Sequence, residues 1–271
     1  MDLKMNGRVA VITGGDSGMG LATAKMMAAE GVKIILVDKT SKELKQASEE
    51  VRQHAGNDTE VLAFTADLTK NDEVLALAQK VRETFGGAHI LAHFAGERGA
   101  AGDFLEITDK GWLETLDTDL MAAVRVCRAF IPQMQDLGWG RVVLISSENA
   151  LQPYEEESPY NAAKAAVVNL SKCLSRAYSK DGLLINCVSP AYVITPMTDE
   201  MMEQQAKERG ESVEETVAWF LDNKRPHIKV KRRGRAEEVA AVVTFLCSEM
   251  ASFVNGSNYR VDGGSVETAF G

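Results

Sequence analysis

The sequence has few of the residues that form disulfides or metal sites. Its 271 residues include four cysteines and four histidines. Cys127, Cys173, Cys187 and Cys247 lie far apart and form no CxxC pair. We therefore expect them to be small core hydrophobes in a reducing compartment, not disulfides or metal ligands. The histidines are equally scattered, so no metal site is predicted.

Positive charge and long apolar runs are also scarce. The net charge of −9 argues against a nucleic-acid surface, which would need a basic stripe. The apolar run Val9–Ile12 begins a few residues from the start and is far too short for a signal peptide or a membrane span. We therefore expect a cytoplasmic protein with no nucleic-acid or membrane partner. The length suits one large domain, residues 1–271.

Short β-branched runs alternate with longer amphipathic stretches along most of the chain. The expected strands are Val9–Thr13, Lys33–Val37, Glu60–Thr65, His89–His93, Arg141–Ser146, Leu183–Val188 and Asn258–Val261. The expected helices are Gly20–Glu30, Ser41–Ala55, Asn71–Phe85, Lys110–Met134, Tyr160–Ser179 and Ala236–Ser248. Strands separated by such helices predict an α/β fold with a doubly wound parallel sheet.

One segment, Met197–Lys231, differs from the rest of the chain in composition because it is rich in Met, Glu, Gln and Lys. It has many good helix formers and few turn residues, which predicts one or two short helices inserted late in the domain. We expect a helical lid over the substrate, with Met197 and Met201 among its contacts. The alternative is that the methionines and aromatics of the segment form a small core of its own.

A glycine-rich turn, Thr13–Gly20, joins the first strand to the first helix. Glycines permit a tight turn, and backbone N–H groups at a helix N-terminus bind a pyrophosphate. Such a pattern alone is weak evidence, but strand, turn and helix occur here in the right order. The residues expected to face a dinucleotide are Gly14, Asp16, Ser17, Gly18, Met19 and Gly20.

Asp38 ends the second strand, eighteen residues after Gly20. A carboxylate there accepts hydrogen bonds from the adenosine ribose and repels a 2′-phosphate, so NAD is favoured over NADP. Lys39 weakens this preference because a cation there suits a 2′-phosphate. The alternative is that Asp38 is a solvated loop residue.

Tyr160 and Lys164 lie one turn apart on the same face of a predicted helix. A nearby ammonium favours the phenolate and draws the tyrosine toward acid/base work. Ser147 follows a strand that ends at the carboxyl edge of the sheet, where ligands bind in open α/β folds. Alone, such a tyrosine–lysine pair is usually surface decoration.

Taken together, these motifs resemble the short-chain dehydrogenase/reductases. The resemblance covers residues 6–264 and rests also on Asn186–Pro190, Thr195, Gly256 and Asp262–Gly264. It implies a Rossmann-type single domain in which Tyr160 is the general acid/base, Lys164 lowers its pKa and holds the nicotinamide ribose, and Ser147 polarises the carbonyl. Asp67 and Leu68 would contact the adenine, and Ala95 and Gly96 the centre of the cofactor. The nicotinamide end would contact Pro190, Val193 and Thr195.

The sequence departs from the family pattern at three places. The fourth strand ends in His93-Phe94 where the family has two asparagines, so both amide side chains are lost. Asp119 replaces an asparagine whose backbone carbonyl, in the family, holds a water leading from Lys164 to solvent. A carboxylate there would alter the field around the lysine. Ala191 replaces a glycine, a mild change unless the position needs positive φ.

The leading interpretation is an NAD-dependent oxidoreductase acting on a small secondary alcohol and its ketone. Polar residues after Ser147 predict a substrate with polar groups near the reacting carbon, such as a cyclic polyol, a sugar or a larger ring alcohol. The expected substrate contacts there are Glu148, Asn149, Gln152 and Tyr154. A 3-oxoacyl carrier-protein reductase is an alternative, disfavoured because Gly138 and Asp181 stand where such relatives carry arginines. A second alternative is a non-catalytic NAD-binding regulator. An epimerase or dehydratase is a minor third alternative.

The resemblance also implies a homotetramer that pairs through the long helices Lys110–Met134 and Tyr160–Ser179, with a second contact near the C-terminal strand. Apolar residues at helical spacing on these helices support this expectation, although an inward-facing core would explain them equally well. They are Leu116, Leu120, Val124, Ala166 and Leu170.

Overall fold

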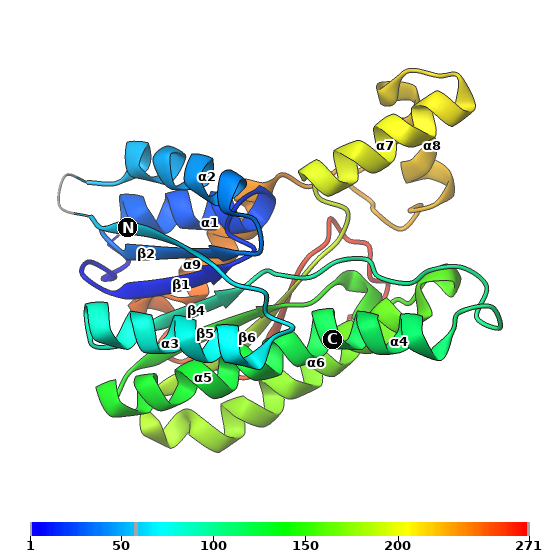
Figure 1. Ribbon diagram of the computed structural model, residues 1–271. Helices are drawn as coiled ribbons and strands as arrows, with labels where there is room; N and C mark the ends of the chain where they lie inside the picture. The colour runs from blue at the N-terminus through cyan, green and yellow to red at the C-terminus, as the bar shows by residue number, and fades with distance from the viewer. Residues whose placement is uncertain (1, 57–58, 270–271) are drawn as a thin grey trace.

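The computed structural model describes residues 2–56 and 59–269, arranged around one parallel sheet (Figure 1). The strand order is β3-β2-β1-β4-β5-β6-β7, and every neighbouring pair is parallel. The strands are β1 (Val9–Thr13), β2 (Lys33–Asp38), β3 (Val61–Thr65), β4 (Ile90–His93), β5 (Gly140–Ile145), β6 (Leu183–Pro190) and β7 (Asn258–Val261). This order confirms the predicted doubly wound sheet.

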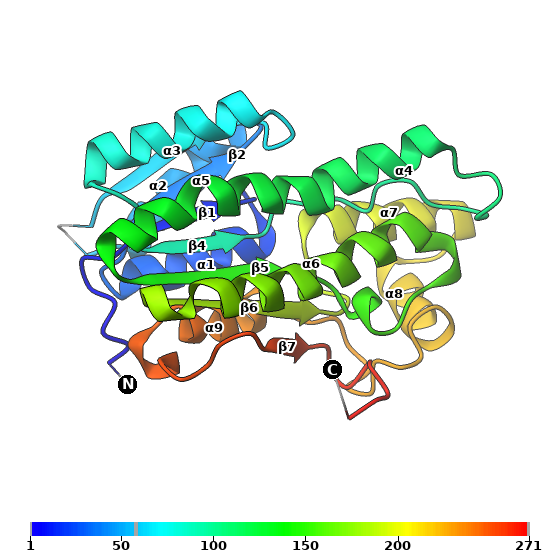
Figure 2. The same ribbon diagram turned by 90° about the horizontal axis from the view of Figure 1, so that it is seen from below.

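Helices cover both faces of the sheet (Figures 1 and 2). On one face lie α1 (Gly18–Ala29), α2 (Ser41–His54) and α9 (Ala236–Leu246). On the other lie α3 (Asn71–Phe85), α5 (Ala122–Leu137) and α6 (Ser158–Tyr178). Boundaries follow the sequence prediction to within a few residues. The helix expected to end at Met134 continues to Leu137, and Gly138 ends it at a φ of +62°.

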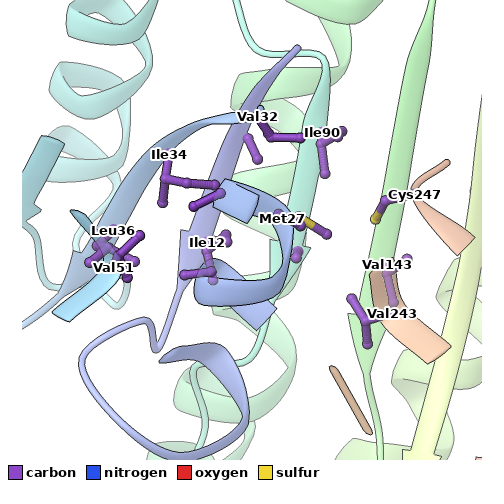
Figure 3. Packing of buried hydrophobic residues seen from close by; sticks show 14 of the residues in the cluster. Ile12, Met27, Val32, Ile34, Leu36, Val51, Ile90, Val143, Val243 and Cys247 are labelled. Carbon is purple, nitrogen blue, oxygen red and sulfur yellow. The ribbon is translucent and has the colours of Figure 1, made fainter. Parts of the chain in front are cut away.

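The alternation of side chains along the strands builds the two layers of core. On β1, Ala10 and Ile12 face the α1/α2/α9 side, whereas Val9 and Val11 face the α3/α5/α6 side. Figure 3 shows Ile12 among neighbours from β2, β4 and α1. Burial on both faces requires strands that are apolar throughout, which is why the sequence shows continuous apolar runs.

The long helix predicted over Lys110–Met134 is interrupted in its first half. It consists of α4 (Asp109–Leu116), one π-helical turn at Asp117–Met121, and α5. A π turn inserts an extra residue and rotates the side chains around it, and such turns are frequent at functional sites. Here the turn carries Asp119, which is buried.

The late insertion forms α7 (Pro196–Arg209) and α8 (Val213–Asn223), which project from the body of the molecule beyond the carboxyl ends of the strands (Figure 1). The two short helices and a small core of the segment's own are present, whereas the lid over the substrate stays a prediction. Met202 and Phe220 belong to a small core of its own that also includes Tyr192. Met197 is 53% exposed and, like Met201, lines the main cavity.

The cysteine prediction needs one correction. Cys127, Cys187 and Cys247 are buried as expected, but Cys173 is exposed because it lies on the outer face of α6. All four are free. No cluster of three metal-binding side chains occurs in residues 2–56 and 59–269. Over the same ranges, every helix is too short or too polar to cross a membrane.

Candidate active site

A cavity of about 990 Å³ opens at the carboxyl edge of the sheet. It lies beyond β1 and β4, the neighbouring strands at which the direction of winding reverses. Ligands of open α/β sheets bind at such a point, and ordinary ligand sites span about 300–1,000 Å³. The cavity therefore has room for a dinucleotide and a small substrate together.

The glycine turn at one end of this cavity fits a pyrophosphate. Gly14 has a φ of +65°, and a Cβ there would lie 2.8 Å from the Ala95 backbone nitrogen. A Cβ at Gly20 would collide with the Gly14 carbonyl oxygen. Only glycine allows this close packing, and it leaves the N-terminal amides of α1 open to an anion.

Asp38 and Asp67, predicted to contact the adenosine ribose and the adenine, both line the cavity. Asp38 lines the cavity and accepts a hydrogen bond from its neighbour, the Lys39 backbone N–H, at 2.6 Å. Burial raises the pKa of Asp38, and the Asp16 carboxylate raises it further. Asp67 lines the cavity next to them and is held by the Thr69 hydroxyl at 2.7 Å. This end of the cavity is therefore acidic.

Lys164 and Tyr160 lie at the middle of the cavity, on the first turns of α6. The Lys164 ammonium lies 5.3 Å from the Tyr160 ring centroid and 3.0 Å from Asp119 Oδ1. It also donates to the Ile145 carbonyl at 3.4 Å. Burial raises the pKa of Tyr160, Lys164 opposes this, and the Ser147 hydroxyl lowers the pKa through a hydrogen bond. The fold therefore brings Ser147, Tyr160 and Lys164 to one cavity, as the spacing predicts, and their acid/base role stays a prediction.

His93, which stands where the family has an asparagine, is buried at the end of β4. Its Nδ1 shares a hydrogen bond of 2.7 Å with the Thr13 hydroxyl and so ties β4 to β1 behind the glycine turn. Burial lowers the pKa of His93 to about 3, so the ring is neutral near neutral pH. The change at Ala191 is tolerated because Ala191 is not among the residues with positive φ.

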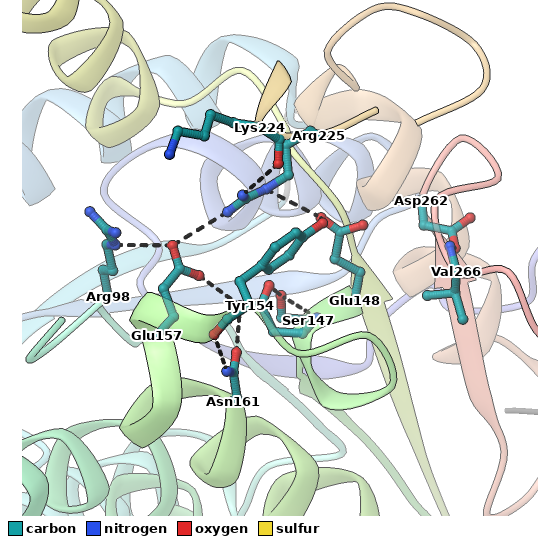
Figure 4. A network of polar contacts seen from close by, with 11 residues as sticks. Arg98, Ser147, Glu148, Tyr154, Glu157, Asn161, Lys224, Arg225, Asp262 and Val266 are labelled. Carbon is teal, nitrogen blue, oxygen red and sulfur yellow. Dashed lines mark hydrogen bonds and ion pairs between the residues drawn. The ribbon is translucent and has the colours of Figure 1, made fainter. Parts of the chain in front are cut away.

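A network of charged and polar groups surrounds the substrate end of the cavity (Figure 4). Glu157 accepts from the Asn149 amide at 2.7 Å and pairs with Arg98 at 3.2 Å and Arg225 at 3.3 Å. Arg225 also lies 3.9 Å from the Glu148 carboxylate and 3.6 Å above the Tyr154 ring. Because Arg225 follows α8, this network links the inserted segment to the catalytic loop.

Glu148 directly follows Ser147 and is almost fully buried, as is Glu157. The Tyr154 hydroxyl donates to Glu148 at 3.0 Å. Burial raises the pKa of Glu148, while Ser265, Tyr154 and Arg225 lower it. The Ser147 hydroxyl donates to the Asn149 side chain at 2.9 Å. Two buried carboxyl groups thus line the same cavity as Ser147 and Tyr160.

Most of the predicted site residues line this one cavity, with four exceptions. Gln152, Tyr154 and Pro190 are not among the residues that line it. Tyr154 lies behind Glu148 and supports it, so its contact with a substrate is indirect. Asp119 also lies behind the cavity wall, where it contacts Lys164.

The sequence interpretation missed Arg98, Glu157 and Arg225. Glu157 has a detectable signal, since it precedes Tyr160 by three residues and shares its face at the start of α6. Arg98 follows the cofactor segment at Gly96 without a recognisable motif. Arg225 has no signal, because only the fold brings the end of α8 beside the loop after β5.

Comparisons with known proteins agree with this geometry. The family model described as enoyl-(acyl carrier protein) reductase matches residues 14–266. A D-beta-hydroxybutyrate dehydrogenase of Rhizobium meliloti is 32% identical over 262 residues, which cover 95% of this chain and 98% of that protein. The structure of L-sorbose reductase from Gluconobacter frateurii, complexed with NADPH and L-sorbose, has a TM-score of 0.94 and 36% identity, covering 99% of this chain and 100% of that one.

A structure of NAD⁺-bound xylitol dehydrogenase has a TM-score of 0.86 and 26% identity, covering 96% of this chain and 100% of that one. These proteins are named for reactions at hydroxyl or keto groups, in keeping with the Tyr160–Lys164–Ser147 constellation. The chain belongs to the short-chain dehydrogenase/reductase family and is an oxidoreductase.

Proposed function

We propose that this enzyme interconverts a neutral, polyhydroxylated secondary alcohol and its ketone, with NAD as cofactor. A bound nicotinamide supplies or accepts the hydride at the substrate carbon. In reduction, Tyr160 donates its phenolic proton to the carbonyl oxygen, and in oxidation its phenolate removes the hydroxyl proton. Ser147 donates a hydrogen bond to the same oxygen, and Lys164 stabilises the phenolate.

The observation that carries the substrate class is the pair of buried carboxyl groups, Glu148 and Glu157, beside Ser147. Carboxylates accept hydrogen bonds from several hydroxyl groups at once, and hydrogen bonds to a charged group contribute about 1.5–3 kcal/mol. The same groups repel a substrate carboxylate or phosphate. Arg98 and Arg225 do not reverse this preference because both guanidinium groups are already paired with these glutamates.

The cofactor preference rests on Asp38 and Asp16. A 2′-phosphate would be placed against both carboxylates, whereas the ribose hydroxyls of NAD would donate to Asp38. Lys39 also lines this part of the cavity, and its ammonium group would favour the 2′-phosphate of NADP. The similar sorbose reductase structure contains NADPH.

A reductase of carrier-bound 3-oxoacyl chains fits less well. Gly138 caps α5, and Asp181 accepts from Gln135 at 2.8 Å, so neither position offers a cation to an acidic carrier. A rate screen of ketoses and polyols at the reduced-nicotinamide band tests the proposal in both directions. We expect turnover of at least one neutral polyhydroxylated compound. Turnover of acyl thioesters alone would refute the assignment.

We further propose a cytoplasmic homotetramer. Four free cysteines support the compartment. The helices α4–α5 and α6 carry partly buried apolar side chains that a second copy could cover, although Leu120 and Leu170 also pack against the core of the chain itself. These are Leu116, Leu120, Val124, Ala166 and Leu170. Light scattering at micromolar concentration should give four times the mass of the chain, and a stable monomer would contradict this.

A further inference from the structure

The buried partner of the catalytic lysine is a carboxylate. Asp119 Oδ1 lies 3.0 Å from Lys164 Nζ, and the side chains of both residues are at most 5% exposed. A Cβ at Gly96 would lie 2.6 Å from Asp119 Oδ1 and 3.0 Å from Lys164 Nζ. The ion pair therefore lies directly beneath the cofactor-binding segment, and it fills the space that the glycine leaves.

The local fold fixes this contact. Asp119 is on the π turn between α4 and α5, and α6 packs against this turn. Lys164 is also held by its contact with the Ile145 carbonyl at the end of β5. Among the residues that the structure describes, the polar partners of the lysine are therefore the Asp119 carboxylate and the Ile145 carbonyl, and the charged Asp119–Lys164 pair has no net charge.

Other charged and titratable groups face this pair from every side. They are Tyr160 on α6, Glu97 after β4, His93 on β4, Cys187 on β6 and Glu157 before α6. Cys187 has a pKa raised to about 12 by burial, and His93 is neutral, so neither carries charge near pH 7. Asp119 is therefore the closest counter-charge to Lys164.

We propose that Asp119 is a positioning residue that sets, through Lys164, the pH at which Tyr160 gives up its proton. The inference rests on the proposed role of Tyr160 as general acid/base. A lone ammonium beside a phenol favours the phenolate, but an ammonium paired with a carboxylate does so much less. Asp119 thus keeps Tyr160 protonated to higher pH, the form that donates a proton in ketone reduction.

Burial raises the pKa of Asp119, whereas the adjacent Lys164 ammonium lowers it and so favours the carboxylate. Burial lowers the pKa of Lys164, but Asp119 and Tyr160 raise it above its usual value, so the lysine stays charged. Burial raises the pKa of Tyr160, and Asp119 adds to the rise while Lys164 opposes it. Because oxidation needs the phenolate, its rate rises with pH through this pKa. Removing Asp119 therefore moves the rise to lower pH.

The test is the pH dependence of kcat/KM for alcohol oxidation in the parent, Asp119→Asn and Asp119→Ser. We expect the midpoint to fall by about one pH unit or more in both variants, the size of effect that a neighbouring charge produces. Asp119→Ser also admits water beside Lys164, so it serves if Asp119→Asn folds poorly. Asp117→Asn is the matched control, because it removes the same charge from the same π turn at a site paired with Arg125.

A second readout does not depend on turnover. Ultraviolet titration of tyrosinate, with the signal of Tyr160→Phe subtracted, follows Tyr160 itself in each background. We expect its midpoint to fall in Asp119→Asn and to stay unchanged in Asp117→Asn. Equal midpoints in the parent and both Asp119 variants, or an equal shift in the control, would overturn the proposal. Absence of activity with a correct titration shift would instead refute the proposed function alone.

Discussion

The cofactor end and the substrate end of the cavity differ in the chemical groups that form their surfaces. At the cofactor end, glycines and helix N-terminal amides form the surface, and β1, α1 and β2 supply them within residues 9–38. At the substrate end, the surface is formed by Glu148, Glu157 and Arg225, whose side-chain ion pairs join residues up to 77 positions apart in the sequence. Backbone geometry recognises a common cofactor, whereas distant charged side chains select a particular substrate.

This contrast predicts that substitutions at the two ends of the cavity alter different kinetic and binding constants. Substitutions at the substrate end should alter KM and substrate preference without altering cofactor affinity. Substitutions at Asp38 should alter cofactor affinity without altering the KM for the substrate or the substrate preference. Only substitution of Tyr160, which lies between the two ends, should abolish turnover while the substrate and the cofactor still bind.

The largest effect is expected at that boundary, in Tyr160→Phe. The variant lacks the transferable proton and part of the stabilisation of the developing oxyanion, so kcat should fall by several powers of ten. NAD affinity and the melting temperature should change little because the ring remains. Stopped assays and cofactor titration by fluorescence measure both quantities. Activity close to that of the parent would remove Tyr160 from the mechanism.

The next largest effect is expected for Glu148→Gln. Losing one charge-assisted hydrogen bond of about 2 kcal/mol should raise KM for a neutral polyol about 30-fold, with NAD affinity unchanged. Glu156→Gln is the control, because it makes the same change at an exposed position on the cavity wall. Equal rises in both variants would mean that net charge, not a contact, sets KM.

At the cofactor end, we expect the parent to use NAD at least tenfold more efficiently than NADP, about 1.4 kcal/mol or more. Asp38→Ala should narrow this ratio mainly by raising kcat/KM with NADP, since a repulsion is removed and no contact is added. Steady-state kinetics with both cofactors decides the point. A preference of the parent for NADP would show that Lys39, rather than Asp38, determines whether the adenosine ribose carries a 2′-phosphate.

The smallest effect is expected in the inserted segment. Met201→Ala and Trp219→Ala should raise KM several-fold and broaden the substrate range, while the dissociation constant for NAD stays constant. Trp219 lines the cavity and lies 3.9 Å from the Arg209 guanidinium, so its loss also loosens the contact between α7 and α8. Weaker NAD binding with unchanged relative activity across substrates would assign the segment to the scaffold.

The same contrast explains what could be predicted from the sequence. The sheet, the glycine turn and the Tyr160–Lys164 pair depend on periodicity and short spacing, which are local properties of the chain. The π turn was not predicted, because an apolar helical pattern continues through Asp119 and only the packing on α6 reveals the extra residue. The partnership of Arg225 with two glutamates also could not be predicted, because it depends on where α8 ends in space.

The proposed substrate end selects a neutral, hydroxylated molecule over a charged one. The most direct measurement is the ratio of kcat/KM for two ketones of equal chain length, a neutral polyhydroxylated ketone and a 3-oxo acid. With Glu148 and Glu157 lining the substrate end, we expect the neutral ketone to be preferred by at least tenfold, about 1.4 kcal/mol. Preference for the acid would contradict it and would mean that Arg98 or Arg225 leaves its glutamate partner to bind the substrate carboxylate.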